Sequence, residues 1–375
     1  MTTTSRLTAL AERIACASIV AMLSCWLGIV ALTWMTNRAL AQSADETELQ
    51  ALFSNWLDEE EIAGGALLIS TPDVRWIVTA GVSNRETQTQ VTPDTRFYAA
   101  STGKMIVAAA ILTAVDEGRI ALDDPIDGFL TTLTGADQLD RAGTVIIEQL
   151  LNHSSGLPEY LTNDFLDASF AAPTTRWGAA DALAYAYDAP AIPPGERFEY
   201  TNSNYVILGH ILETLDGSLA QSLQRWVFRR ADMKATTVGA PPDPGTQFAH
   251  GYDVDGEDVS ALGWNSVLGD GPVITTVGDL EAFARALFAS QRIISFASRD
   301  DMIAPSALEP YYGLGVGIDE DDFGIFYGHA GGYNGFEADL RYYPEHDLVL
   351  TYLVNGNQLS DGDLLDLAAD WHFNQ

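Results

Sequence analysis

The pattern of apolar and polar positions divides the chain into strand-like ends and a largely helical middle. Near the beginning, residues 65–70 and 75–80 are short apolar runs, separated by a Thr-Pro-Asp segment that is typical of a turn. Near the other end, residues 336–343 and 348–354 repeat this arrangement around a second turn. The sequence therefore predicts two antiparallel hairpins, one from each end of the chain.

Helical periodicity accounts for much of the remaining chain. Residues 46–60 place their larger apolar side chains on one helical face, residues 364–371 form a last helical segment, and the pattern is mostly helical from about 147 to 287. These elements predict an α+β fold, in which one antiparallel sheet built from both chain ends is flanked by helices and carries an inserted helical region. No repeat, flexible linker or charge block marks a boundary, so residues 42–375 are predicted to form one domain.

The first residues have the features of an export signal. Arg6 and Arg13 precede an apolar run at residues 14–35, and a small-x-small pattern ends at Ala41. We therefore predict that residues 1–41 are a signal peptide and that the protein is exported, to the periplasm or out of the cell. The apolar run is also long enough to span a bilayer, so an uncleaved segment that tethers the protein to a membrane is the alternative.

The cysteines and histidines argue against disulfide, thiol and metal chemistry. Both cysteines, Cys16 and Cys25, lie inside the predicted signal peptide, so the mature chain has none. His250, His346 and His372 are isolated in the sequence, and no H-E-x-x-H segment is present. We therefore predict neither a metal nor another cofactor.

Charge excludes one class of partner and singles out one lysine. The formal net charge is −33, and a chain so acidic repels nucleic acids. Of the 19 lysines and arginines only two are lysines, Lys104 and Lys234. An arginine keeps its proton in proteins, whereas a lysine gives it up in suitable surroundings, and Lys104 stands close to a serine. This points to a role for the Lys104 amine.

The strongest motif is Ser-x-x-Lys at the start of an apolar helix. Ser101 and Lys104 are three residues apart, and the residues after them predict a helix that ends near Gly118. At this spacing the two side chains share one helical face. Serine becomes a strong nucleophile only when a base takes its proton, and an uncharged lysine, favoured by apolar surroundings and a helix start, is such a base. The helix start also offers backbone N–H groups to an oxyanion.

Two further segments carry candidate site residues. In the first, Tyr200 and Asn202 are expected on a loop just before a helix. A phenol relays protons, and an amide binds both a lysine and a substrate carbonyl. In the second, His329, Gly331 and Gly332 precede the strand predicted near the C-terminus, and glycines allow a substrate backbone to approach closely.

In order and spacing, these three motifs resemble the penicillin-recognising serine hydrolases, in the branch that holds class C β-lactamases, serine D-alanyl-D-alanine carboxypeptidases and related esterases. The similarity extends from about Leu49 to Asn355 and includes the segments 117–126, 150–158 and 312–315. The resemblance implies a β-lactamase/transpeptidase-like α/β sandwich and a covalent acyl-enzyme.

The resemblance also implies a role for each motif residue. Ser101 would be the nucleophile and Lys104 its base, and Tyr200 would pass the proton to the leaving group. The remaining residues would bind the substrate or the oxyanion, and they are Asn202, Gly331, Gly332 and His329. Of these, His329 stands where class C β-lactamases usually have a lysine, and the Gly332 N–H would complete the oxyanion hole.

The implied function is that of a serine hydrolase with a small-molecule or peptide substrate. A D-alanyl-D-alanine carboxypeptidase-like activity is favoured. An esterase or class C-like β-lactamase is the alternative on the same scaffold, and a protein that kept the fold but lost turnover is the alternative from another class. One departure from the family is the segment 269–276, Gly-Asp-Gly-Pro-Val-Ile-Thr-Thr, where an alanine-glycine-glycine stretch is common. Its carboxylate and proline are expected near the rim of the cleft, where they would alter the choice of substrate. No cationic side chain beyond His329 is evident for a substrate carboxylate.

Overall fold

The computed structural model describes residues 45–241, 244–356 and 363–374. The predicted signal peptide, which contains both cysteines, lies outside the described residues, so it stays a prediction. Within the described ranges, no helix is long and apolar enough to cross a membrane. The chain divides into two compact units, residues 1–51 and 52–375, and the second unit holds all the elements described below.

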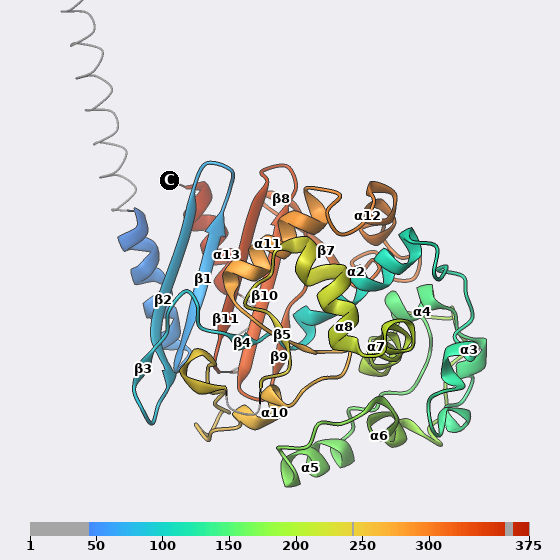
Figure 1. Ribbon diagram of the computed structural model, residues 1–375. Helices are drawn as coiled ribbons and strands as arrows, with labels where there is room; N and C mark the ends of the chain where they lie inside the picture. Colours follow the sequence, from blue (N-terminus) through green and yellow to red (C-terminus); the bar gives the residue numbers. More distant parts are fainter. Residues whose placement is uncertain (1–44, 242–243, 357–362, 375) are drawn as a thin grey trace, which may run out of the picture. The chain divides into compact units, whose positions relative to one another are not determined.

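One antiparallel sheet of eight strands dominates the fold (Figure 1). Its strands are β1 (Gly64–Ser70), β2 (Arg75–Asn84), β3 (Thr89–Gln90), β7 (Gly317–Asp321), β8 (Gly324–Gly328), β9 (Gly331–Tyr333), β10 (Phe336–Tyr343) and β11 (Leu348–Val354). Their order is β3-β2-β1-β11-β10-β8-β7, and β9 also pairs with β10. Both predicted hairpins, β1–β2 and β10–β11, are confirmed.

The two ends of the chain meet in the centre of the sheet. Strand β1 pairs with β11 over six residues, from Gly65 opposite Val354 to Ser70 opposite Val349. In Figure 1 the blue strands of the beginning therefore lie beside the red strands of the end. The predicted α+β arrangement, with one sheet built from both chain ends, is confirmed.

Helices cover both faces of this sheet. Strand residues alternate between faces, so the neighbours Leu67 and Leu68 point in opposite directions, and each is fully buried. Helix α11 (Val277–Phe288) packs on one face, where Phe288 stacks on Tyr342, and α13 (Asp363–Phe373) packs on the other (Figure 1). A strand covered on both faces reads as a continuous apolar run, which is the pattern of β1 and β11.

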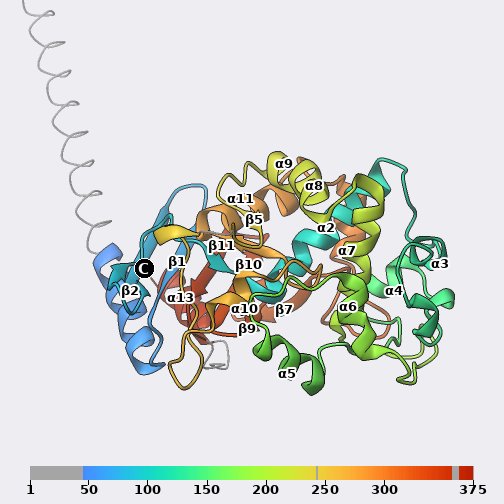
Figure 2. The same cartoon turned by 60° about the horizontal axis from the view of Figure 1, so that its bottom comes forward.

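The remaining elements form a helical region beside the sheet, shown from a second direction in Figure 2. Its helices are α3 (Asp127–Leu130), α4 (Ile147–Leu151), α5 (Asn163–Ala171), α6 (Ala179–Leu183), α7 (Asn202–Asp216), α8 (Leu219–Leu223), α9 (Arg229–Ala231), α10 (Ser260–Trp264) and α12 (Phe296–Met302). A second, three-stranded sheet consists of β4 (Phe97–Tyr98), β6 (Val273–Thr275) and β5 (Thr237–Val238).

Helix α2 (Gly103–Asp116) runs through the hydrophobic core. It is apolar all round, and every residue from Gly103 to Ala114 is buried, as expected for a helix surrounded by protein. The helix ends close to the predicted position, where Gly118 adopts a left-handed conformation with a φ of 67°. A rigid, buried helix thus carries the lysine of the Ser-x-x-Lys motif at its first turn.

Candidate active site

Ser101 lies on a strained turn between strand β4 and helix α2. It belongs to a single 3-10 turn, Ala100–Thr102, so the serine stands just before the α-helix that sequence analysis placed it on. Ala100 has a φ of 45°, a left-handed conformation that is unfavourable for a residue with a side chain. The Thr102 hydroxyl donates to the carbonyl oxygen of His329 at 3.0 Å, which holds the turn against the main sheet.

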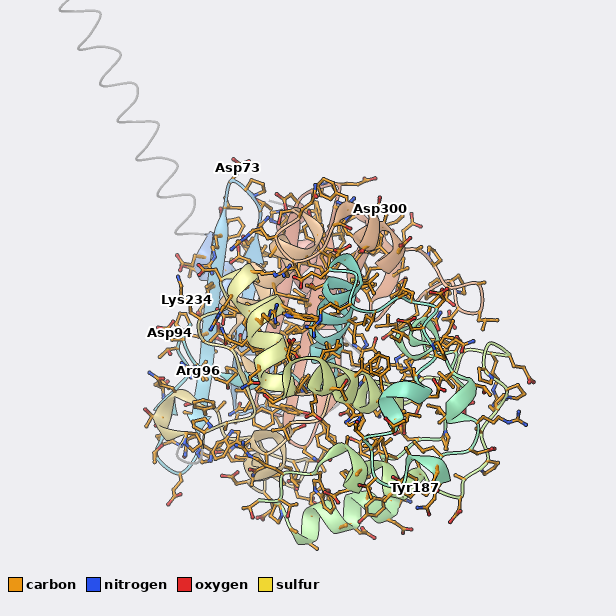
Figure 3. All side chains as sticks on the ribbon, turned by 45° about the vertical axis from the view of Figure 1, so that its right-hand side comes forward. Asp73, Asp94, Arg96, Tyr187, Lys234 and Asp300 are labelled. Carbon is orange, nitrogen blue, oxygen red and sulfur yellow. The ribbon has the colours of Figure 1, made fainter. Side chains whose placement is uncertain are left out.

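Lys104 is fully buried, and its amine contacts the serine. Its Nζ lies 2.8 Å from Ser101 Oγ, 2.8 Å from Asn202 Oδ1 and 2.9 Å from the backbone oxygen of Asp270. Lys234, the other lysine, lies at the surface, where it pairs with Asp232 (Figure 3). Of the two lysines, the one that the motif singled out is therefore enclosed by the site.

The three contacts of Lys104 Nζ are compatible with a charged and with an uncharged amine. An ammonium group has three protons to donate, and the three oxygen atoms around Nζ accept all of them. The uncharged amine has two, which the oxygens of Asn202 and Asp270 still accept. Its lone pair is then directed at the serine hydroxyl, which donates its proton to it.

Glu159 orients the Asn202 side chain. Asn202 Nδ2 donates to Glu159 Oε2 at 3.0 Å, and the Asn202 backbone N–H donates to the same oxygen at 2.8 Å. Because the amide nitrogen faces this carboxylate, the amide oxygen faces Lys104. Asn202 is the first residue of α7, so it lies on the helix itself and not on the loop before it, where it was expected.

Tyr200 flanks the lysine from the open side of the site. Its ring stacks on that of His153, with 4.2 Å between centroids, and the centroid of the Tyr200 ring is 5.1 Å from Lys104 Nζ. The side chain of Tyr200 is 39% exposed. The structure thus brings together four of the predicted residues, Ser101, Lys104, Tyr200 and Asn202.

His329 lies in a hydrogen-bonded chain of aromatic side chains. Its Nε2 is 3.1 Å from the Tyr312 hydroxyl, which is also 3.4 Å from Nε2 of His153. His329 Nδ1 is 2.5 Å from the Ala330 oxygen, so Nδ1 carries the proton and Nε2 accepts from Tyr312. Burial and the nearby positive charge of Lys104 lower the pKa of His329 to about 4, so the ring is neutral at pH 7. His329 is not among the residues that line the cavity.

Gly331 and Gly332 lie on an edge strand next to the serine. Strands β8 and β9 both pair with β10, and they are separated from each other by His329 and Ala330. A β-carbon on Gly331 would lie 2.6 Å from the Ser101 nitrogen and 2.7 Å from the Thr102 nitrogen, so only glycine fits here. Gly332, which is exposed, lines the cavity with Ser101.

Ser101 opens into a cavity of about 770 Å³, including its mouth. Six aromatic rings line part of its wall, those of Tyr98, Tyr160, Phe165, Trp177, Tyr200 and Tyr333. Among the described residues, Asp270 is the one acidic or basic side chain in the lining, and the Tyr160 hydroxyl donates to its Oδ2 at 2.8 Å. The cavity therefore combines aromatic rings with hydroxyl and amide groups and a single carboxylate.

Glu159 and Tyr160 were not predicted from the sequence as site residues. Glu159 and Tyr160 directly follow the segment 150–158 that resembles the family, which is the one signal that pointed to them. The Asp270 carboxylate was expected near the rim of the cleft and lines the cavity, but the contact of its backbone oxygen with Lys104 was not predicted. Among the described residues, no group of three or more histidine, cysteine, aspartate or glutamate side chains is placed to hold a metal ion.

Comparison with known proteins shows the family to which the chain belongs. Residues 49–373 match the β-lactamase family. The chain is 26% identical to penicillin-binding protein 4* of Bacillus subtilis, over 86% of this chain and 75% of that protein. It is 27% identical to penicillin-binding protein 4 of Amycolatopsis lactamdurans, over 83% and 86% of the two chains.

A solved structure is similar to this chain over most of its length. The penicillin-binding protein from Bacillus halodurans superposes with a TM-score of 0.70 at 26% identity, over 82% of this chain and 94% of that chain. The predicted β-lactamase/transpeptidase-like fold is thereby confirmed. Because the family match extends over most of its length, this chain belongs to the β-lactamase family.

Proposed function

We propose that the protein is a serine hydrolase that cleaves small amides or esters through an acyl-enzyme on Ser101. The observation that carries this proposal is the 2.8 Å separation between Ser101 Oγ and the buried Nζ of Lys104, at the wall of a cavity. A hydroxyl in contact with a base, and open to a cavity, is the arrangement that nucleophilic catalysis needs.

The acylation step uses the contacts around Lys104. Ser101 Oγ forms a bond to the substrate carbonyl carbon, its proton moves to Lys104 Nζ, and the carbonyl oxygen becomes an oxyanion. The backbone N–H groups of Ser101 and Gly332 are proposed to stabilise this oxyanion. When the oxyanion collapses, the bond to the leaving group breaks and Tyr200 passes a proton to it. Water then attacks the serine ester and releases the acid, and the proton returns to Ser101 Oγ.

The charge of the cavity favours substrates without a carboxylate. A peptide C-terminus or a β-lactam carries a carboxylate that a binding site normally pairs with a cation. The described lining residues include no lysine, arginine or histidine, and His329 is neutral at pH 7. Neutral or positively charged amides and esters therefore suit this site better.

A D-alanyl-D-alanine carboxypeptidase is the second candidate. The names of the relatives favour it, because a serine that binds penicillin in such proteins is also the serine that reacts with these peptides. A substrate panel separates the candidates: a p-nitrophenyl short-chain ester, an amino acid p-nitroanilide, a chromogenic cephalosporin and a D-alanyl-D-alanine peptide. Turnover of the ester or anilide at least tenfold above the peptide supports the proposal, and the reverse order replaces it with the carboxypeptidase.

We also propose that the protein is exported, because substrates of this kind are accessible to an enzyme outside the cytoplasm. Mass spectrometry of the protein purified from its host cell fractions tests it. A chain that begins at Gln42 supports cleavage after Ala41, and an intact chain in the membrane fraction supports the anchor formed by residues 14–35.

A further inference from the structure

The carboxylate of Asp270 is the feature of the cavity that acyl transfer does not use. The backbone oxygen of Asp270 accepts a hydrogen bond from Lys104 Nζ, while its side chain lines the cavity together with Ser101. One residue thus contacts the catalytic base on one side and presents a charge to the substrate on the other. The charged group that lines the cavity next to the reacting atoms is therefore a carboxylate.

This carboxylate is held in a fixed position. A β-carbon on Gly269 would lie 2.1 Å from the Tyr205 backbone oxygen, and one on Gly271 would lie 2.5 Å from the Tyr98 hydroxyl, so the backbone on both sides is tightly packed. The side chain is anchored by the Tyr160 hydroxyl. A group with this little freedom is preorganised to bind a partner.

The Asp270 carboxylate has no basic partner of its own. Among the described residues, no lysine, arginine or histidine forms an ion pair with it. Burial raises the pKa of Asp270, and the charge of Lys104 only partly offsets this. A carboxylate in such surroundings is stabilised when a cation binds to it, and the cavity gives access to a ligand that carries one.

We infer that the Asp270 carboxylate binds a positively charged amine in the acyl part of the substrate, close to the carbonyl that Ser101 attacks. This inference rests on the proposed function and deepens it. Beside the carboxylate, Phe165 packs between Tyr160 and Trp177, with ring centroids 4.9 and 5.1 Å away, and these rings offer an apolar wall to a side chain. The substrates are therefore amides or esters of apolar amino acids with a free amino group.

The overall charge of the protein acts in the same direction. With a formal net charge of −33, the protein attracts cationic substrates and repels anionic ones at low ionic strength. The local and the global charge thus select the same substrates.

A matched pair of substrates tests the inference. Phenylalanine p-nitroanilide, as each enantiomer, is compared with 3-phenylpropionyl p-nitroanilide, which has the same acyl skeleton without the amine. We expect kcat/KM of the full-length wild type to be at least tenfold higher for one enantiomer of the amine substrate. In Asp270→Asn this ratio falls 10- to 100-fold, because a charge-assisted hydrogen bond is lost.

Two further variants sharpen the result. Tyr160→Phe keeps the carboxylate but removes its anchor, so the ratio should fall less than in Asp270→Asn. Asp94→Asn removes one negative charge from an exposed position (Figure 3) that is not part of the cavity lining, and it should leave the ratio unchanged. A ratio that stays constant in Asp270→Asn while both activities fall would show that Asp270 serves only Lys104, and would overturn the inference.

A binding measurement on the wild type does not depend on any variant. We expect 3-phenylpropylamine to inhibit at least tenfold more strongly than 3-phenylpropionate, which has the same skeleton and the opposite charge. Stronger inhibition by the acid would contradict the inference. Labelling of Ser101 by a fluorophosphonate, which carries no amine, is read in parallel. If labelling fails, the proposed function fails. If labelling succeeds without a preference for the amine, only the role of Asp270 is wrong.

Discussion

The backbone of Gly331 lies against the backbone of Ser101 so closely that a β-carbon on Gly331 would come within 2.6 Å of the Ser101 nitrogen. The nucleophile and the edge strand β9 are therefore positioned by one another. This contact joins the Ser-x-x-Lys motif to the histidine-glycine motif, which lie more than 200 residues apart in the sequence.

Replacing Gly331 by alanine should displace Ser101. The methyl group meets backbone nitrogens, which do not move aside as a flexible side chain does. We expect kcat/KM to fall at least 100-fold and the free energy of unfolding to fall by about 1–3 kcal/mol. Hydrolysis assays and urea denaturation measure both. Gly128→Ala is the control, because nothing lies within 4 Å of a β-carbon at that helical position. Activity of Gly331→Ala within threefold of the wild type would contradict this account of the contact.

The Lys104→Arg variant distinguishes a role of Lys104 as proton acceptor from a role of its positive charge. Arginine keeps a positive charge but does not give up its proton, so it cannot accept the proton of Ser101. We expect a loss of at least 1000-fold in kcat, of the order found when a nucleophile loses its base. Lys234→Arg, at the exposed lysine, should retain full activity. If Lys104→Arg keeps more than a tenth of the wild-type kcat, the lysine acts only through its charge.

The contrast between local and long-range contacts explains what the sequence could predict. Ser101 and Lys104 are one turn apart, so their spacing alone indicates contact. Asp270 contacts Lys104 through its backbone oxygen, and Glu159 contacts Asn202 through a carboxylate on a loop. Neither contact is associated with a recognisable sequence pattern. Only folding brings these loops to Lys104.

The same contrast holds for the fold. The central strands β1 and β11 are buried on both faces, so their apolar runs were recognised. The hairpin β7–β8 at the edge of the sheet was missed. Its residues are mostly exposed or half-buried, and β7 includes Asp319, Glu320 and Asp321, so it has no apolar run. Charged side chains on an edge strand prevent it from pairing with other chains. The same charged side chains interrupt the hydrophobic pattern by which a strand is recognised in the sequence.

The protein should lose stability in mild acid through His329. The pKa of this histidine is about 4 in the folded protein, compared with 6.5 for an ordinary histidine, because burial and the charge of Lys104 disfavour its protonation. Below pH 6.5 the unfolded chain takes up a proton here and the folded protein does not. The contribution to stability is therefore full above pH 6.5 and declines as the pH falls toward 4.

His329→Gln removes this dependence. Glutamine still accepts a hydrogen bond from Tyr312 but does not titrate. Between pH 7 and pH 5 the variant should lose about 1–2 kcal/mol less unfolding free energy than the wild type. Urea denaturation at the two pH values gives the comparison. Equal losses in the two proteins would show that His329 is not kept neutral in the folded state.

The central claim is that Ser101 becomes acylated, and intact-protein mass spectrometry tests it most directly. The full-length protein is mixed with a fluorophosphonate, which carries no carboxylate, and the modified peptide is mapped. The account predicts one adduct, located on Ser101, that is absent in Ser101→Ala and strongly slowed in Lys104→Ala. An adduct on another residue, or turnover of amide and ester substrates by Ser101→Ala, would contradict it.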